Sequence, residues 1–271
     1  MMSLIARRCV SVVATAGTVT ALALVGSGAA HASGANYVAL GDSYASGVGA
    51  GNYTSSSGSC DQSTNAYPQL WDGANAPSSF SFEACSGATT TDVLDNQLSP
   101  LSSSTSLVSI TIGGNDVGFS SVMETCDLEG TSACVSAVDN AESAAKSQLP
   151  AKLDTLYSAI KAAAPNAHVV VLGYPEFYDL SKSSSCIGLS YTSRSAINGG
   201  SDLMDSVIAT QAAAYGFTYV DVRPYFSGHQ ICDSSAWLHS LNILDLTESY
   251  HPTAAGQSGA YYPAFKAGVA E

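Results

Sequence analysis

The stretch YVALGDSYASG, residues 37–47, decides the fold of this chain. Its first four residues are apolar, and Gly41, Asp42 and Ser43 then end the run. An apolar run that stops at a glycine turn predicts a buried strand followed by a sharp bend. Ser43 would lie on that bend, where a serine serves equally well as a helix N-cap or as a nucleophile.

Similar short runs recur along the rest of the chain. Apolar, β-prone residues occupy 80–82, 107–112, 168–172 and 217–220, and apolar residues have helical spacing over 149–164, 193–215 and 253–267. Pro150 is expected either to kink the first of these helices or to start its second part. Strands that alternate with helices predict one α/β domain with a mainly parallel sheet covered on both faces.

Glycine-containing turns with polar residues follow three of the expected strands. They are Gly41-Asp42-Ser43, Ser86-Gly87 and Gly113-Gly114-Asn115-Asp116. The carboxyl ends of parallel strands meet at one edge of the sheet, and ligands of such sheets bind there. The three turns are therefore expected to converge on a functional site.

The first 32 residues have the features of a secretory signal peptide. Arg7 and Arg8 precede an uncharged apolar stretch over 9–25, and Ala30-His31-Ala32 matches the small-x-small cleavage pattern. The apolar stretch is shorter than the roughly 20 residues that a membrane span needs. We therefore expect a secreted protein with a signal peptide over 1–32 and a single domain over 33–271.

Charge limits the partners of the chain. The 271 residues include 22 acidic and 9 basic ones, with a formal net charge of −13. Such a charge disfavours nucleic acid and anionic membranes as partners. No later stretch is apolar enough for stable membrane insertion, and a monomer is the expected state.

Cysteine usage agrees with an oxidising compartment. Six cysteines follow the signal peptide, and an even number in an exported protein indicates disulfide bonds. Sequential pairing is the simplest hypothesis, but the sequence alone does not choose among the possible pairings. No Cys-x-x-Cys spacing occurs, so neither a metal nor another cofactor is expected. The six are Cys60, Cys85, Cys126, Cys134, Cys186 and Cys232.

Nucleophilic catalysis by a serine requires a base and donors for the oxyanion. Asn115 follows two glycines, which leave its side-chain amide free to donate, and Gly87 can present its backbone N–H nearby. His251 precedes Pro252 at the start of the last expected helix. Position alone favours His251 only slightly over His239.

These residues occur in the order of a known family. Gly41-Asp42-Ser43 with Gly47, then Gly87, then Gly113-Gly114-Asn115-Asp116, then His251-Pro252 resemble the four blocks of the SGNH (GDSL-type) hydrolases. The stretches YVALGDSYASGVG and SYHPTA look like the secreted lipases and phospholipases A1 of actinobacteria. The resemblance covers nearly all of 33–271. It implies a flavodoxin-like three-layer α/β/α sandwich with a five-stranded sheet.

The resemblance also implies a role for each matched residue. Ser43 is the expected nucleophile, forming an acyl-enzyme with a lipid or other ester substrate, and His251 is the expected general base and then acid. The backbone N–H groups of Ser43 and Gly87 and the side chain of Asn115 would form the oxyanion hole. Asp42 and Asp116 would hold the turns. The six cysteines would pair sequentially, as in the enzymes resembled.

The chain departs from the family pattern at one position. The usual last block, Asp-x-x-His, has Glu248 in place of the aspartate. The Glu248 side chain could orient His251 in a triad, or a backbone carbonyl of Glu248 or Ser249 could do so in a Ser–His dyad. The actinobacterial lipases that the chain resembles use a backbone carbonyl, so the dyad is favoured.

Other functions are open to this fold. A carbohydrate esterase that removes acetyl groups is the second enzymatic hypothesis, because a short pocket would suit acetyl and an apolar groove would suit long acyl chains. Turn segments over 117–119 and 174–180 could line such a groove. A non-catalytic secreted binding module is disfavoured, because Ser43, Asn115 and His251 are all present.

Overall fold

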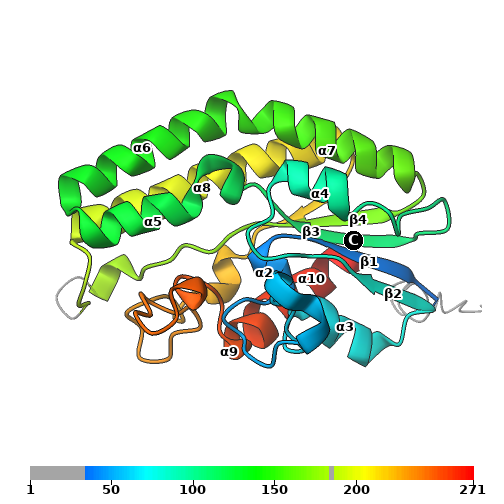
Figure 1. Ribbon diagram of the computed structural model, residues 1–271, viewed down its shortest axis with the longest axis horizontal. Helices are drawn as coiled ribbons and strands as arrows, with labels where there is room; N and C mark the ends of the chain where they lie inside the picture. The colour runs from blue at the N-terminus through cyan, green and yellow to red at the C-terminus, as the bar shows by residue number, and fades with distance from the viewer. Residues whose placement is uncertain (1–33, 183–185) are drawn as a thin grey trace, which may run out of the picture.

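The centre of the molecule is a five-stranded sheet in which every neighbouring pair of strands is parallel (Figure 1). The computed structural model describes residues 34–182 and 186–271, so the signal peptide predicted for 1–32 lies outside the described residues. The strand order is β2-β1-β3-β4-β5. The strands are β1 (Asn36–Gly41), β2 (Ser79–Phe82), β3 (Leu107–Thr111), β4 (His168–Leu172) and β5 (Thr218–Val220).

The central strands are apolar on both faces because helices cover both faces. All five residues of β3 are buried, and so are the last five residues of β1. Ser109 and Thr111 are the polar residues of β3, and Ser109 lies in the middle of the strand. The hydroxyl groups of Tyr37 and Tyr67 lie 2.7 and 3.2 Å from its Oγ, so its buried oxygen is hydrogen-bonded.

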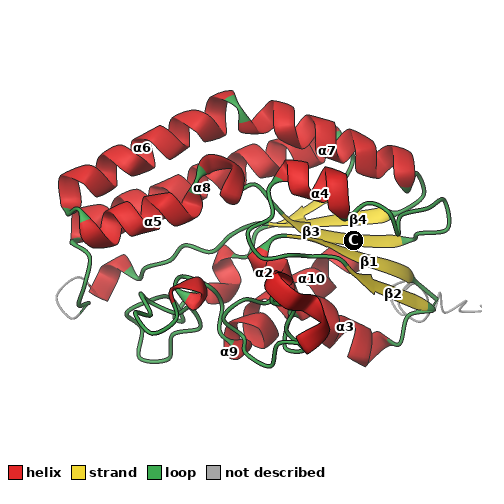
Figure 2. Cartoon of the chain, in the orientation of Figure 1, coloured by secondary structure: helices red, strands yellow, loops and turns green. Residues whose placement is uncertain are grey.

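Helices form a layer on each side of the sheet (Figure 2). The three-layer α/β/α sandwich predicted from the sequence is therefore confirmed. One layer contains α4 (Thr90–Asn96), α5 (Phe119–Leu128), α6 (Thr131–Ser147), α7 (Leu149–Ala163) and α8 (Tyr191–Ala214). The other contains α3 (Tyr67–Asn75), α9 (Ala254–Gly256) and α10 (Tyr262–Val269).

Some of the helices were predicted from the sequence and others were not. Pro150 lies in the first turn of α7, where the missing N–H costs nothing, so it starts a new helix rather than kinking one. The helix expected over 253–267 is interrupted by a π-helical turn, Gln257–Tyr261. Helices α3 to α6 were not predicted. The longest, α6, buries only Cys134, Val138 and Ala145, so its apolar stripe is thin.

Within residues 34–182 and 186–271, no helix is long and apolar enough to cross a membrane.

Candidate active site

The bend between β1 and the short helix α2 (Ser43–Ser46) depends on Gly41. Gly41 has a φ of +127°, and a Cβ atom there would lie 2.5 Å from the carbonyl oxygen of Thr111. The Gln97 side chain accepts from the Gly41 N–H at 2.8 Å and donates to its carbonyl at 2.9 Å. Only glycine fits this backbone, so the strand ends here and Ser43 follows at the sheet edge.

Asp42 fixes the bend from inside the protein. Its carboxylate accepts hydrogen bonds from the Tyr44 N–H at 3.0 Å, from Thr111 Oγ1 at 2.7 Å and from the Tyr174 hydroxyl. Burial raises the pKa of Asp42 to about 6, although these hydrogen bonds oppose the shift. Because all of its partners belong to the framework, the side chain positions the turn that carries Ser43.

His251 lies directly against Ser43. Its Nε2 is 2.7 Å from Ser43 Oγ, and its Nδ1 is 2.9 Å from the carbonyl oxygen of Ser249. A carbonyl only accepts, so Nδ1 carries the proton and Nε2 is left to accept one from Ser43. Burial lowers the pKa of His251 to about 4, and the bond to Ser249 partly offsets this effect. The imidazole is therefore neutral at pH 7, as a general base must be.

Glu248 is engaged elsewhere. Its carboxylate accepts a hydrogen bond from the Tyr53 hydroxyl at 2.9 Å, and its carbonyl accepts from the backbone N–H of His251 at 3.2 Å. Of the acceptors that the sequence left open, the carbonyl of Ser249 is the one that faces Nδ1. The geometry is that of a dyad with a backbone orienting group.

Asn115 opens a 3₁₀ turn, Asn115–Val117, after β3. One N–H of its amide donates to the carbonyl of Ala88 at 3.0 Å, which leaves the second N–H for a ligand. The next residue, Asp116, accepts from the N–H and hydroxyl of Thr90 at 2.9 and 2.8 Å and pairs with Lys152 at 3.1 Å. Asp116 thus ties the Asn115 turn to α4 and α7.

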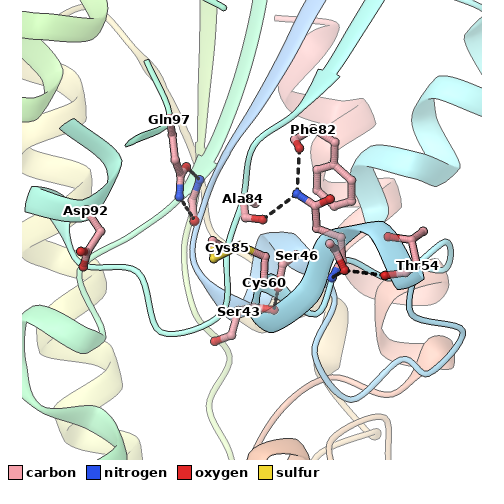
Figure 3. The surroundings of a disulfide bond; sticks show 12 residues. Ser43, Ser46, Thr54, Cys60, Phe82, Ala84, Cys85, Asp92 and Gln97 are labelled. Carbon is pink, nitrogen blue, oxygen red and sulfur yellow. Dashed lines mark hydrogen bonds between the residues drawn. A yellow bond between two sulfur atoms is a disulfide. The ribbon is translucent and has the colours of Figure 1, made fainter. Parts of the chain in front are cut away.

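Gly87 lies on a turn that is fastened to the Ser43 bend. The disulfide between Cys60 and Cys85 lies beside Ser43 (Figure 3). The Cys85 N–H donates to the Gly41 carbonyl at 3.0 Å, and the Ser86 N–H donates to the Cys60 carbonyl at 3.1 Å. Gly87 has a φ of +77°, a conformation that side chains rarely adopt.

A small pocket brings Ser43 and Asn115 together. Gly87 lines a neighbouring open groove instead, together with the Cys60–Cys85 disulfide. The Ser43 N–H is in the first turn of α2, where helical N–H groups have no intrahelical partner. Of the three expected oxyanion donors, Ser43 and Asn115 line this pocket, and Gly87 lines the neighbouring groove.

The serine pocket adjoins a larger apolar one. Phe119, Phe177 and Met204 line both. The segments 117–119 and 174–180, which the sequence analysis named as possible groove walls, each contribute to it. The walls formed by α5, α6 and α8 were missed, because their apolar stripes do not reveal which helices lie side by side. The further lining residues include Val122, Met123, Val138, Ala141, Ala145 and Ile197.

The other two disulfides brace the helical layer and the loops. Cys126 of α5 is joined to Cys134 of α6, and Cys186 to Cys232. The three disulfides join the cysteines in sequential pairs. This is the pairing that the simplest hypothesis and the family resemblance both predicted. No group of three or more histidine, cysteine or acidic side chains that could hold a metal ion occurs within residues 34–182 and 186–271.

A family model and a curated relative each match most of the chain. The model of the GDSL-like lipase/acylhydrolase family matches residues 39–258. Lipase 1 of Streptomyces coelicolor is 58% identical over 253 residues, which cover 93% of this chain and 94% of that protein.

Two crystal structures superpose on the molecule. An extracellular lipase from Streptomyces rimosus does so with a TM-score of 0.84 and 52% identity, over 86% of this chain and 99% of that one. A phospholipase A1 from Streptomyces albidoflavus NA297 has the same TM-score and coverage, with 54% identity.

The fold and these relatives define the class of protein, a hydrolase of carboxylic esters. The chain belongs to the GDSL-like lipase/acylhydrolase family.

Proposed function

We propose that the chain is a secreted, monomeric lipid ester hydrolase of the lipase and phospholipase A1 type, acting through an acyl-enzyme on Ser43. The observation that carries the proposal is the 2.7 Å contact between Ser43 Oγ and His251 Nε2, next to an apolar pocket. In this proposal residues 1–32 are a signal peptide and residues 33–271 the hydrolase domain.

The proposed reaction begins when Ser43 attacks the ester carbonyl while His251 takes its proton at Nε2. The N–H groups of Ser43 and Gly87 and the amide of Asn115 hold the oxyanion. His251 then protonates the leaving alcohol, which departs and leaves the acyl group on Ser43. In the second half, His251 activates water, which attacks the acyl-enzyme and frees the acid and Ser43.

The 2.9 Å contact with His251 Nδ1 supports an orienting role for the Ser249 carbonyl in this proposal. It keeps the proton on Nδ1 and turns Nε2 toward Ser43. A neutral carbonyl stabilises the imidazolium of the intermediate less than a carboxylate would. The imidazole is therefore a weaker base than one paired with a carboxylate, and burial lowers the pKa of His251 further, to about 4.

The apolar pocket supports a long acyl chain as the substrate's acid part. Its walls are formed by residues of α5, α6 and α8 together with Val117 and Phe177, and nearly all of these side chains are apolar. Relatives that are 52–58% identical are described as lipases and a phospholipase A1. An acetyl esterase is therefore the less well supported function.

Hydrolysis of p-nitrophenyl esters from acetate to palmitate, with phosphatidylcholine in parallel, tests the proposal. We expect activity on long chains, and we expect Ser43→Ala to lower kcat by about 10⁴-fold or more, because the nucleophile is lost. Activity on acetate alone would favour an acetyl esterase. Equal activity of the wild type and the variant would overturn the role of Ser43.

Ala141→Phe tests the acyl pocket. Ala141 lines the pocket and is only half-buried, so a phenyl ring there shortens the pocket without filling the core. We expect the preferred chain length to shift from long toward short esters, with activity on butyrate retained. Ala151→Phe, on the exposed face of α7, is the matched control and should leave the preference unchanged. An unchanged profile in Ala141→Phe would place the acyl chain elsewhere.

A further inference from the structure

The loop over residues 240–248, which leads to His251, exposes its apolar side chains. Leu241, Ile243, Leu244 and Leu246 are 40, 79, 93 and 68% exposed. Several large apolar side chains exposed on one loop are typical of a site that binds another protein, a ligand or a membrane.

Polar residues of the same loop point back and hold it in shape. The Asn242 N–H donates to Ser249 Oγ at 2.8 Å, and its Oδ1 accepts from the Leu244 N–H at 3.1 Å. Glu248 accepts from the hydroxyl of Tyr53. Asn242 and Glu248 are half-buried, whereas Ser240, Asp245 and Thr247 are exposed together with the apolar side chains of the loop.

The loop is anchored at the site. Its two ends pair with each other: the His239 N–H donates to the His251 carbonyl at 2.9 Å, and the Tyr250 N–H donates to the His239 carbonyl at 3.1 Å. His239 Nε2 lies 2.8 Å from the carbonyl of Gly49, and the Tyr44 hydroxyl donates to the Tyr250 carbonyl at 2.7 Å. If the loop inserts into another surface, Ser43 and His251 therefore lie close to that surface.

The charge of the loop and of the whole chain indicates which kind of lipid surface the loop can bind. The sequence contains no lysine or arginine between Arg223 and Lys266, while the loop contains Asp245 and Glu248. The chain as a whole carries a formal net charge of −13. An anionic membrane would repel this face, whereas a lipid surface without net charge would not.

We propose that the 240–248 loop docks the enzyme on a lipid surface without net charge by inserting Leu241, Ile243, Leu244 and Leu246. This inference rests on the proposed function, because it supplies the route by which an aggregated acyl lipid reaches Ser43. Burial of apolar side chains drives the docking. The anchoring of the loop at His239 and His251 sets the position of the site relative to the lipid.

Binding is tested on vesicles of a diether phosphatidylcholine, which has no ester to cleave. We expect the double variant Ile243→Ser, Leu244→Ser to lower co-sedimentation affinity by about tenfold or more, because two inserting side chains are lost. The double variant Leu128→Ser, Ile187→Ser is the matched control. It removes the same two residue types from positions that are 74 and 98% exposed outside the loop, and affinity should be retained.

Activity supplies the second readout. Hydrolysis of dissolved p-nitrophenyl butyrate should be the same in the loop variant and the wild type, because the loop variant leaves the contacts of Ser43 and His251 in place. Hydrolysis of ester phosphatidylcholine vesicles should fall in proportion to the loss of binding.

Three results would overturn the docking role: unchanged vesicle affinity in the loop variant, an equal loss in the control, or tighter binding to vesicles that contain phosphatidylglycerol. Failure of the wild type to hydrolyse any ester would instead overturn the proposed function. The diether vesicles keep the two cases apart, since they measure docking without catalysis.

Discussion

Ser43 and His251 lie in contact, but they are held by very different parts of the molecule. Ser43 follows a buried strand, and the bend before it is fixed by Asp42, Gln97 and the Cys60–Cys85 disulfide. His251 follows an exposed loop outside the sheet, and its ring is oriented by one backbone carbonyl two residues away.

The difference separates two ways of positioning a reactive group. The serine side is determined by many buried contacts, so each of its groups depends on the sheet. On the histidine side, a backbone carbonyl replaces a side chain, so the identity of the neighbouring side chains matters less. Substitutions on the serine side should therefore cost more activity than those around the histidine.

Asn115→Ala is the substitution expected to sharpen this contrast most. We expect kcat to fall by about 100- to 1,000-fold, as on loss of one oxyanion donor in other hydrolases, with little change in KM. Steady-state kinetics on a p-nitrophenyl ester measure the effect. Asn166→Ala, which removes a comparable amide bond to the carbonyl of Ser103, is the control. A loss below threefold in Asn115→Ala would remove this residue from the oxyanion hole.

The pH profile tests the histidine side. His251 must be neutral to accept the Ser43 proton, and burial lowers its pKa from the ordinary 6.5 to about 4. We expect kcat/KM to stay level from pH 7 down to pH 5 and to fall about tenfold per pH unit below the pKa.

Burial also raises the pKa of Asp42 to about 6, so the pH profile alone does not identify the group that titrates. NMR of the His251 ring protons would show whether the fall in kcat/KM follows the protonation of this imidazole. A His251 titration near 6.5 would contradict the effect of burial on the imidazole.

Glu248→Gln has the smallest expected effect. The glutamine oxygen can still accept from the Tyr53 hydroxyl, and the Ser249 carbonyl still faces Nδ1, so we expect a change in kcat below about threefold. A fall of two orders of magnitude or more would mean that the Glu248 carboxylate orients His251 in a triad. The same ester assay decides the question.

Much of the fold was predictable from local pattern. The five strands were expected at the places where they occur because each is a short β-prone run that ends in a turn, as with the run before Gly41. Helices α5 and α6 were not expected. Their buried positions are few and widely spaced, and Cys126 and Cys134 pack through a disulfide rather than through an apolar stripe.

The site was predictable in its residues but not in its contacts. The order of Ser43, Gly87, Asn115 and His251 identified the candidates. The sequence could not decide between the carboxylate of Glu248 and the carbonyl of Ser249, because two or three residues of loop can bring either to the ring. The contact between Glu248 and Tyr53, 195 residues apart in the chain, removes the carboxylate from that choice.

The sequence by itself determined the family, the parallel sheet and the candidate site residues, because turns and apolar runs are local features. The tertiary structure decided the acceptor behind His251, the apolar pocket among α5, α6 and α8, and the outward-facing leucines of the 240–248 loop. Each of these depends on which distant segments pack together. That packing is set by the burial of whole surfaces, and no local stretch of sequence encodes it alone.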